Sequence, residues 1–213
     1  MYIKRVFLTV GLTLAAVFIV WYGVKPILEK NAPPIIMPEI TTATILKPKN
    51  VVTNFSLTDT TNQPFTEKSL LGQWTLMFFG YAQCPEICPK TLIKITELWK
   101  QVPQDLHFVF VSLDPESDTV QILRDFLGRF NSEFRGLTGE AAVIQKLAKA
   151  CGIYSWQDPK ENDPSKPKMI DHSATLLLIN PQGQLHAVFS PPYHPEIMAK
   201  DLKQILSTSI QNR

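Results

Sequence analysis

Residues 74–99 read WTLMFFGYAQCPEICPKTLIKITELW and combine a strand pattern, a loop with two cysteines and a helix pattern. The nearly continuous apolar run Trp74–Phe79, which ends at Gly80, is typical of a central strand that is covered on both faces. Pro89 favours the first turn of a helix, and apolar side chains follow it at helical spacing up to Trp99. We therefore expect a strand-loop-helix unit with the cysteines at its turn.

The segments on either side of this unit alternate between strand and helix patterns. A short hairpin is expected near Asn54–Phe65, and Asp118 is expected to cap a helix. The other expected elements are strands at His107–Leu113, Thr175–Ile179 and Leu185–Ser190 and helices at Val120–Phe130, Glu140–Ala150 and Pro195–Leu206. This order predicts an α/β fold with a mixed central sheet.

The composition suits one domain with an appendage. The chain has 213 residues, of which 45% are hydrophobic, and 21 Lys and Arg residues against 19 Asp and Glu residues. These charges form no basic stripe, so we expect no nucleic-acid partner. Only three cysteines occur, which argues against a disulfide scaffold and favours a metal or redox site.

The N-terminal segment has the pattern of a membrane anchor. The run Val6–Val24 carries no charge and is long enough to cover most of the roughly 30 Å hydrocarbon layer of a bilayer. Lys4 and Arg5 precede it, so the positive-inside tendency places Met1 in the cytoplasm. We expect residues 1–25 to form one transmembrane helix in a bacterial-type inner membrane, with the remaining chain in the periplasm or an equivalent exported compartment.

A cleaved signal peptide is the alternative interpretation of this segment. Such peptides end in small residues, whereas this run ends in WYGVKP. Residues 26–50 contain five prolines and are expected to form a Pro-rich linker to a folded domain at residues 51–208. The charged segment Gln157–Lys168 is expected to be an exposed loop near the site.

Cys84 and Cys88 lie four positions apart at the expected helix start. Residues at this spacing face one side of a helix, and the helix N-terminus favours thiolates. Two thiolates form a soft metal site, which selects Cu(I) and tolerates zinc. Among the four histidines, His172 is best placed to be a third donor, because it precedes a strand and can reach the carboxyl end of a neighbouring one.

Other polar candidates have weaker signals. Asp171 is interpreted either as a carboxylate that orients the neighbouring imidazole or as an ordinary loop residue. Glu86 is expected to be solvated, and Cys151 to be a buried thiol without a catalytic role. The remaining histidines are interpreted as solvated or capping residues: His107, His186 and His194.

Three motifs in order, GYxxCPxxCP (80–89), VSLDP (111–115) and DHS (171–173) before an apolar strand, resemble the SCO/SenC family. The resemblance covers the chain from about Val51 to its last helix. It implies a thioredoxin-like fold that binds one copper ion, as Cu(I) or Cu(II), through Cys84, Cys88 and His172. It makes Asp114 a candidate outer or weak axial group. Ala82-Gln83 replaces the Thr-His that the family often has before the first cysteine.

The same resemblance implies a role and partners. The expected function is delivery of copper to, or preparation of, the binuclear copper site in a subunit of cytochrome c oxidase, and the expected partners are this subunit and a copper donor protein. A thiol-disulfide oxidoreductase that uses Cys84 and Cys88 as a redox pair is the alternative, although the spacing is C-x-x-x-C and no proline opens the strand after His172. A thioredoxin-fold peroxidase ranks third, because it leaves His172 unexplained. We expect a metallochaperone more than an enzyme.

Overall fold

The computed structural model describes residues 18, 21–22, 39–50, 54–102, 106–156 and 170–210. The chain divides into two units, Met1–Glu39 and Ile40–Arg213. Most of the predicted span Val6–Val24 and the whole predicted loop Gln157–Lys168 lie outside the described residues. Within the described part of the chain, no helix combines the length and the apolar character that a membrane crossing requires.

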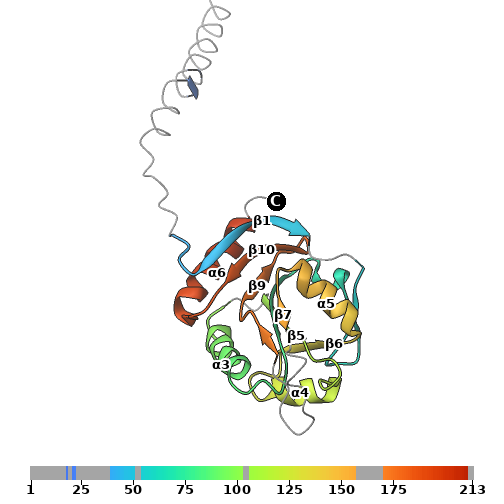
Figure 1. Ribbon diagram of the computed structural model, residues 1–213. Helices are drawn as coiled ribbons and strands as arrows, with labels where there is room; N and C mark the ends of the chain where they lie inside the picture. Colours follow the sequence, from blue (N-terminus) through green and yellow to red (C-terminus); the bar gives the residue numbers. More distant parts are fainter. Residues whose placement is uncertain are drawn as a thin grey trace, which may run out of the picture. The chain divides into compact units, whose positions relative to one another are not determined.

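An eight-stranded mixed sheet forms the centre of the second unit, in the order β1-β10-β9-β4-β5-β6-β2-β3 (Figure 1). The parallel neighbours are β4, β5 and β6, whereas β9 runs antiparallel to β4. The mixed α/β sheet expected from the sequence is therefore confirmed. The strands are β1 (Ala43–Asn50), β2 (Ser56–Asp59), β3 (Pro64–Thr66), β4 (Trp74–Gly80), β5 (Leu106–Ser112), β6 (Arg135–Thr138), β9 (Leu176–Ile179) and β10 (Gln184–Phe189).

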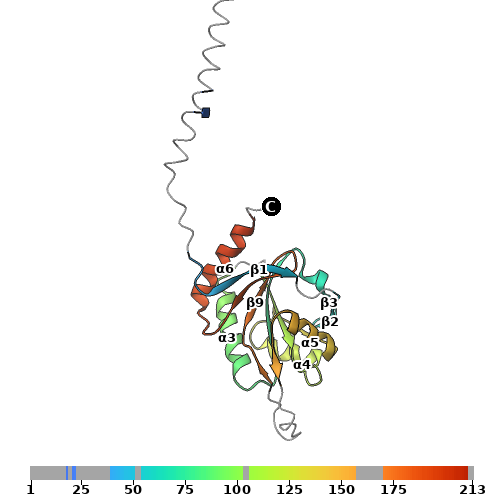
Figure 2. The ribbon, with the colours of Figure 1, turned by 45° about the horizontal axis from the view of Figure 1, so that its top comes forward.

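Four described helices flank the sheet: α3 (Ile87–Trp99), α4 (Val120–Gly128), α5 (Ala141–Ala150) and α6 (Pro195–Ile210). A 3₁₀ turn, Glu67–Leu70, follows β3, and a separate two-stranded ribbon pairs β7 (Ser155–Trp156) with β8 (Asp171–His172). Figure 2 shows α3 and α6 side by side, away from α5.

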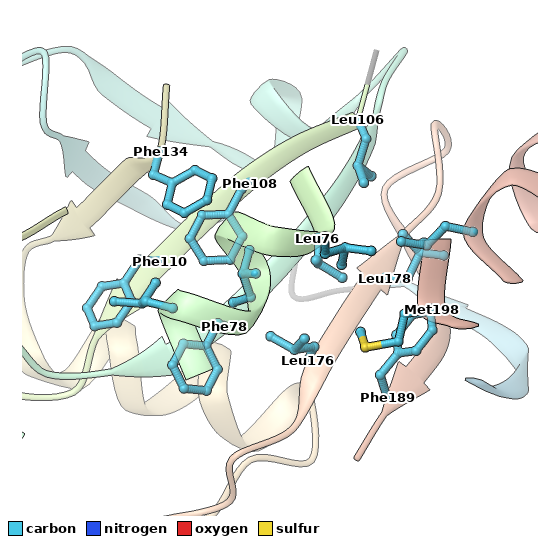
Figure 3. Packing of buried hydrophobic residues seen from close by; sticks show 14 of the residues in the cluster. Leu76, Phe78, Leu106, Phe108, Phe110, Phe134, Leu176, Leu178, Phe189 and Met198 are labelled. Atoms are coloured by element: carbon cyan, nitrogen blue, oxygen red, sulfur yellow. The ribbon is translucent and has the colours of Figure 1, made fainter. Parts of the chain in front are cut away.

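The side chains of β4 alternate between two cores. Leu76 and Phe78 belong to the cluster that α3, α4 and α6 cover, and Figure 3 shows them packed against neighbouring strands. Met77 and Phe79 belong to a second cluster, which α5 and the β2–β3 hairpin cover. Successive residues of a strand point to opposite faces, so the uninterrupted apolar run reflects burial on both sides. Each fully buried Leu or Phe contributes about 2 kcal/mol to stability.

The sheet brings two distant segments to one edge. The chain leaves β4 at Gly80 and enters the cysteine loop and α3. Because β9 is antiparallel to β4, with Phe78 opposite Leu176, the beginning of β9 lies beside the end of β4. The residues that lead into β9, including His172, are therefore delivered to the edge that carries the cysteines.

Two sequence-based expectations are wrong in detail. Residues Ala43–Asn50 were expected in the linker but form β1, which pairs with β10, so the folded unit starts at Ile40 and not at Val51. The strand contains Pro48, which an edge strand tolerates, and its partner is remote in the chain. The cap of α4 is Thr119, whose hydroxyl accepts a hydrogen bond from the Ile122 N–H, and Asp118 has another role.

Candidate metal centre

The cysteine loop begins where β4 ends and is held by its own backbone and by a buried carboxylate. The Cys84 N–H donates to the Tyr81 carbonyl oxygen at 3.2 Å. The Ala82 N–H donates to Asp118, with 3.1 Å between nitrogen and Oδ2. Asp118 is fully buried and also accepts a 2.7 Å hydrogen bond from the Ser112 hydroxyl at the end of β5. The loop is thus tied to the ends of β4 and β5.

The start of α3 uses sulfur where a capping side chain is usual. Glu86 is the N-cap residue, and its side chain makes no capping hydrogen bond. The Cys88 N–H donates instead to Sγ of Cys84 at 3.4 Å. A free N–H group at a helix N-terminus favours a negative acceptor, so this contact stabilises a Cys84 thiolate. Cys88 lies in the first turn of α3 with its side chain fully buried.

His172 reaches the cysteines from the β7–β8 ribbon, in which it lies opposite Ser155. Its Nε2 atom is 3.5 Å from Sγ of Cys88. Its ring packs edge-on against Phe78 and Tyr81, with ring centroids 6.1 Å apart in both pairs. The imidazole therefore lies against the end of β4 as well as against the sulfur atoms.

Cys84, Cys88 and His172 offer three ligand atoms that all lie within 4.8 Å of one another. Thiolate and imidazole donors hold a metal ion at about 2.0–2.3 Å, so donors that share one ion are about 3.5–4 Å apart. The observed separations need only a small contraction to meet this condition. Two sulfur donors and one imidazole suit a soft ion such as Cu(I).

Electrostatics separates the two thiols. The pKa of Cys84 is lowered to about 3, chiefly by a hydrogen bond from the Cys88 thiol. Burial opposes this shift, and hydrogen bonds from His172 and from the N–H groups of Cys88 and Glu86 add to it. The hydrogen bond to Cys84, together with burial, raises the pKa of Cys88. The pair therefore holds one thiolate and one thiol at neutral pH, and the thiolate is the half-exposed residue. A metal ion replaces the shared proton when it binds.

Cys84 and His172 open onto a small cavity of about 190 Å³. Its walls come from the cysteine loop (Tyr81, Cys84, Pro85, Glu86 and Ile87) and from the segment before β9 (Ile170, Asp171 and His172). A larger cavity of about 590 Å³ lies beside Leu106 and His107, at the opposite end of β5. It contains none of the three donors, so we assign the chemistry to the smaller cavity.

The two acidic candidates were expected around the donors and not among them. Neither Asp114 nor Asp171 joins the group of ligand atoms described above. Asp114 is buried, and its backbone carbonyl accepts from the Asp118 N–H in the turn after β5. Asp171 lines the cavity. The Nδ1 atom of His172 lies 3.3 Å from the Ser173 carbonyl oxygen, which therefore occupies the position that was expected for the Asp171 carboxylate.

The remaining cysteine and histidines lie elsewhere. Cys151 is buried in the cluster on the α5 face of the sheet, whereas Cys88 belongs to the cluster on the other face. His186 packs against Trp74, and burial lowers its pKa. Neither His107 nor His194 belongs to the described donor group.

Three residues of the site were missed in the sequence. Asp118 had the pattern of a helix cap, and only the fold shows that it holds the cysteine loop. A Cβ atom on Gly80 would lie 2.7 Å from Sγ of Cys88, so glycine is needed for close approach of the sulfur. Tyr81 touches both His172 and the cysteine loop. The GY pair before the first cysteine was visible, but nothing in the sequence indicated its contacts.

A family model described as SCO1/SenC matches residues 43–207. A protein of Stutzerimonas stutzeri that is named for copper binding is 34% identical over 167 residues, which cover 76% of this chain and 80% of that protein. The mitochondrial SCO1 homolog of Homo sapiens is 34% identical over 135 residues, which cover 61% of this chain and 44% of that protein. The chain thus spans less than half of the length of this mitochondrial relative.

Solved structures share the fold. ScoI of Bradyrhizobium japonicum with copper bound superimposes with a TM-score of 0.64 at 33% identity, covering 76% of this chain and 99% of that one. BsSco, for which a disulfide switch is described, belongs to the Sco family of cytochrome c oxidase assembly proteins. It matches with a TM-score of 0.57 at 22% identity over 75% of this chain and 95% of its own, which shows the fold alone.

Proposed function

This chain belongs to the SCO1/SenC family, and we propose that it binds one copper ion and delivers copper to, or prepares, the binuclear copper site of a cytochrome c oxidase. The convergence of Cys84, Cys88 and His172 within 4.8 Å carries this proposal. The copper-bound ScoI structure and the relative named for copper binding support it. An oxidase is proposed as the partner because the Sco family, to which BsSco belongs, is described as a family of cytochrome c oxidase assembly proteins.

The three donor atoms suit copper in both of its oxidation states, Cu(I) and Cu(II). The dithiol pair alone satisfies soft Cu(I), whereas harder Cu(II) requires the imidazole nitrogen as well. The cavity beside Cys84 and His172 leaves these donors accessible from one side. An incoming ligand from a donor or acceptor protein can therefore approach the ion without unfolding of the domain.

Delivery by a membrane-anchored protein is the finer part of the proposal. We place the domain on the exported side of a bacterial-type inner membrane, held by one helix within residues 1–25. This location is supported by the uncharged run Val6–Val24, which Lys4 and Arg5 precede. Reporter fusions to the C-terminus provide the test: activity only on the cytoplasmic side would contradict this location, and a mature N-terminus after residue 24 would indicate cleavage.

A thiol-disulfide oxidoreductase is the second candidate function. The observation in its favour is the low pKa of Cys84 beside a protonated Cys88, which is the arrangement of an attacking thiolate and a second thiol. In that role a partner disulfide is reduced while a Cys84–Cys88 disulfide forms. In this exchange His172 would only stabilise the Cys84 thiolate, whereas its place in the three-donor geometry gives it a direct role in binding an ion and therefore favours copper.

Metal analysis distinguishes the two functions. The reduced full-length protein should hold one copper ion against a competing chelator, and the Cys84→Ser, Cys88→Ser and His172→Ala variants should each bind copper more weakly. The Cys151→Ser variant is the matched control, because Cys151 lies on the opposite face of the sheet. A wild-type protein that binds no copper but reduces protein disulfides would favour the oxidoreductase.

A further inference from the structure

The ribbon that carries His172 exposes two aromatic side chains. Among the described residues of the unit Ile40–Arg213, Tyr154 (79%) and Trp156 (59%) have the largest exposed fractions of any large hydrophobic side chain. Trp156 lies in β7, and Tyr154 lies two positions before it. Neighbouring exposed apolar side chains mark interaction sites, whereas isolated ones need no explanation. The two aromatic side chains therefore indicate a contact surface.

Pairing within the ribbon places Trp156 beside the donor cavity. Trp156 lies directly opposite Asp171, and Ser155 lies opposite His172. Opposite residues of an antiparallel pair share one face, with Cβ atoms about 4.5–5.5 Å apart, whereas neighbours along a strand point to opposite faces. His172 therefore belongs to the face that is turned towards the end of β4. Trp156 shares the other face with Asp171, which lines the cavity.

The other wall of the cavity also carries an exposed apolar side chain. Ile87, the first residue of α3, lines the cavity, and about half of its surface is exposed. It belongs to the cysteine side of the cavity, whereas Tyr154 and Trp156 belong to the ribbon on the histidine side. We refer to Ile87, Tyr154 and Trp156 as the apolar rim.

Copper exchange with another protein requires that this protein cover the apolar rim. A donor atom binds a metal ion at about 2.0–2.3 Å, so a protein ligand that takes copper from Cys84 and His172 must enter the cavity between its two walls. The surface around this ligand then lies against the residues that line the cavity and against their direct neighbours. The occupant of the apolar rim is therefore the protein that exchanges copper with this site.

The charges beside the rim indicate the character of this partner. Glu86 forms a surface ion pair with Lys90, one turn further along α3, so the two charges offset each other. Asp171 adds one exposed carboxylate. Interacting surfaces have complementary potentials, so a rim with this little net charge fits a surface that is apolar around its copper ligands and not strongly basic.

We propose that Tyr154 and Trp156, with Ile87 across the cavity, form the docking surface for the copper-accepting subunit of the oxidase. This inference deepens the proposed copper function and rests on it. One Cu(I) ion passes in each encounter without a change of oxidation state. Its bonds to the sulfur atoms of Cys84 and Cys88 are replaced by bonds to the acceptor, and the acceptor ligand that binds the ion gives up the proton that the cysteine pair regains.

Copper transfer from the full-length protein tests the docking surface. The Cu(I)-loaded protein is mixed with the copper-free, reduced oxidase subunit, and the copper that reaches the subunit is measured after separation. Tyr154→Ser and Trp156→Ser should each lower the second-order rate of transfer about tenfold or more, because buried Tyr and Trp side chains dominate the energetics of protein interfaces. Trp156→Phe should retain most of the wild-type rate, because it keeps an aromatic contact.

Transfer to a small Cu(I) chelator is the control reaction. The chelator reaches the cavity without a protein surface, so both serine variants should hold one copper ion and lose it to the chelator at the wild-type rate. Leu71→Ser is the matched control variant. Leu71 is also exposed, but it precedes β4 and so lies at the opposite end of this strand from the cysteine loop. Its replacement should leave transfer to the oxidase subunit unchanged.

The outcomes separate this inference from the proposed function. A wild-type protein that binds no copper, or that transfers none to the subunit, would refute the proposed function and this inference with it. When the wild type transfers copper, wild-type rates in both serine variants would overturn the docking surface alone. Equal losses towards the subunit and the chelator would also overturn it, because they would show a disturbed copper site.

Two further results are decisive. Should Trp156→Ser not fold, Tyr154→Ser decides alone, because Tyr154 lies outside the paired positions of the ribbon. A wild-type dimer in sedimentation that both serine variants dissociate would assign the surface to a second copy of this chain and would overturn the proposal.

Discussion

Sγ of Cys88 lies 3.5 Å from Nε2 of His172, although 84 positions separate these residues in the chain. The contact depends on the antiparallel pairing of β9 with β4, which places the segment before Leu176 beside the end of β4. Each ligand role can therefore be tested through the element that positions it, and not only by removal of the ligand.

Loss of His172 should affect the two copper oxidation states differently. Cu(I) is soft and tolerates two thiolates, so His172→Ala should weaken Cu(I) binding less than Cys84→Ser or Cys88→Ser does. Cu(II) prefers a site that contains nitrogen, so the same variant should lose the Cu(II) form and its charge-transfer colour. Parallel titrations with Cu(I) and a competing chelator, and with Cu(II) followed by visible absorption, measure both effects. A wild-type Cu(II) spectrum in His172→Ala would exclude the histidine as a ligand.

The reactivity of Cys84 should be nearly independent of pH over the neutral range. Its pKa is lowered to about 3, so the thiolate persists down to that pH. The rate of alkylation of reduced, metal-free protein should stay flat from about pH 5 to about pH 8, whereas an ordinary thiol reacts roughly tenfold more slowly per unit below its pKa of about 8.5. Mass spectrometry of the labelled peptide identifies the site. A tenfold rise per pH unit at Cys84 would contradict the assignment.

The same shift has a consequence for stability. Since the folded-state pKa of Cys84 lies below the unfolded value, its stabilising contribution is complete above about pH 8.5 and declines as pH falls towards about 3. Cys84→Ser should therefore flatten the pH dependence of the free energy of unfolding within this window. Denaturant titrations at several pH values provide the measurement, and identical slopes for both proteins would contradict the expectation.

Gly80→Ala should displace a ligand without changing any ligand. The added Cβ would lie 2.7 Å from Sγ of Cys88 and 3.0 Å from the Phe110 ring. We expect a loss of about 1–3 kcal/mol in the free energy of unfolding, as is common for overpacked cores, together with weaker copper binding. Gly128→Ala is the control, since its Cβ would meet no atom within 4 Å. Equal copper affinity in wild type and Gly80→Ala would show that the sulfur relaxes freely.

Asp201 should anchor the start of the folded domain. This buried carboxylate of α6 accepts hydrogen bonds from the N–H groups of Thr41 and Thr42 and from the Thr42 hydroxyl at 2.6 Å. Asp201→Ala should lower the free energy of unfolding by about 2–4 kcal/mol, because two backbone N–H groups and one hydroxyl lose a charged acceptor. Asp125→Ala, on the exposed side of α4, is the control. Thermal or denaturant unfolding measures both variants. An equal loss in the free energy of unfolding for Asp201→Ala and Asp125→Ala would argue against a specific anchor.

Air oxidation should link Cys84 to Cys88 and leave Cys151 free. The sulfur atoms of the first two lie within 4.8 Å of each other, and the Cys88 N–H already contacts the Cys84 sulfur. Cys151 is buried in the cluster on the opposite face of the sheet. Peptide mapping under non-reducing conditions measures the pairing. A linkage of Cys151 to either motif cysteine would refute it.

Local patterns determined much of this protein from the sequence. The apolar run of β4, the helical spacing after Pro89 and the four-residue cysteine spacing predicted a strand, a helix and a soft donor pair, because each depends on neighbours within a few positions. The DHS motif identified His172 through family resemblance. The sequence also predicted the mixed α/β sheet from the order of its elements.

Tertiary structure alone decided the features that depend on distant partners. The segment of β1 was predicted to be a linker, because it contains two lysines and Pro48 and has no alternating apolar pattern. Only its pairing with β10 makes it a strand. The sequence predicted Asp118 to be a helix cap, and only the fold shows that its carboxylate accepts a hydrogen bond from the Ala82 N–H. The contacts of Tyr81 with Ile170 and His172 arise in the same way. Sequence patterns report local backbone preferences and burial, whereas a hydrogen bond across the sheet requires the register of remote strands, which is set only when the whole core packs.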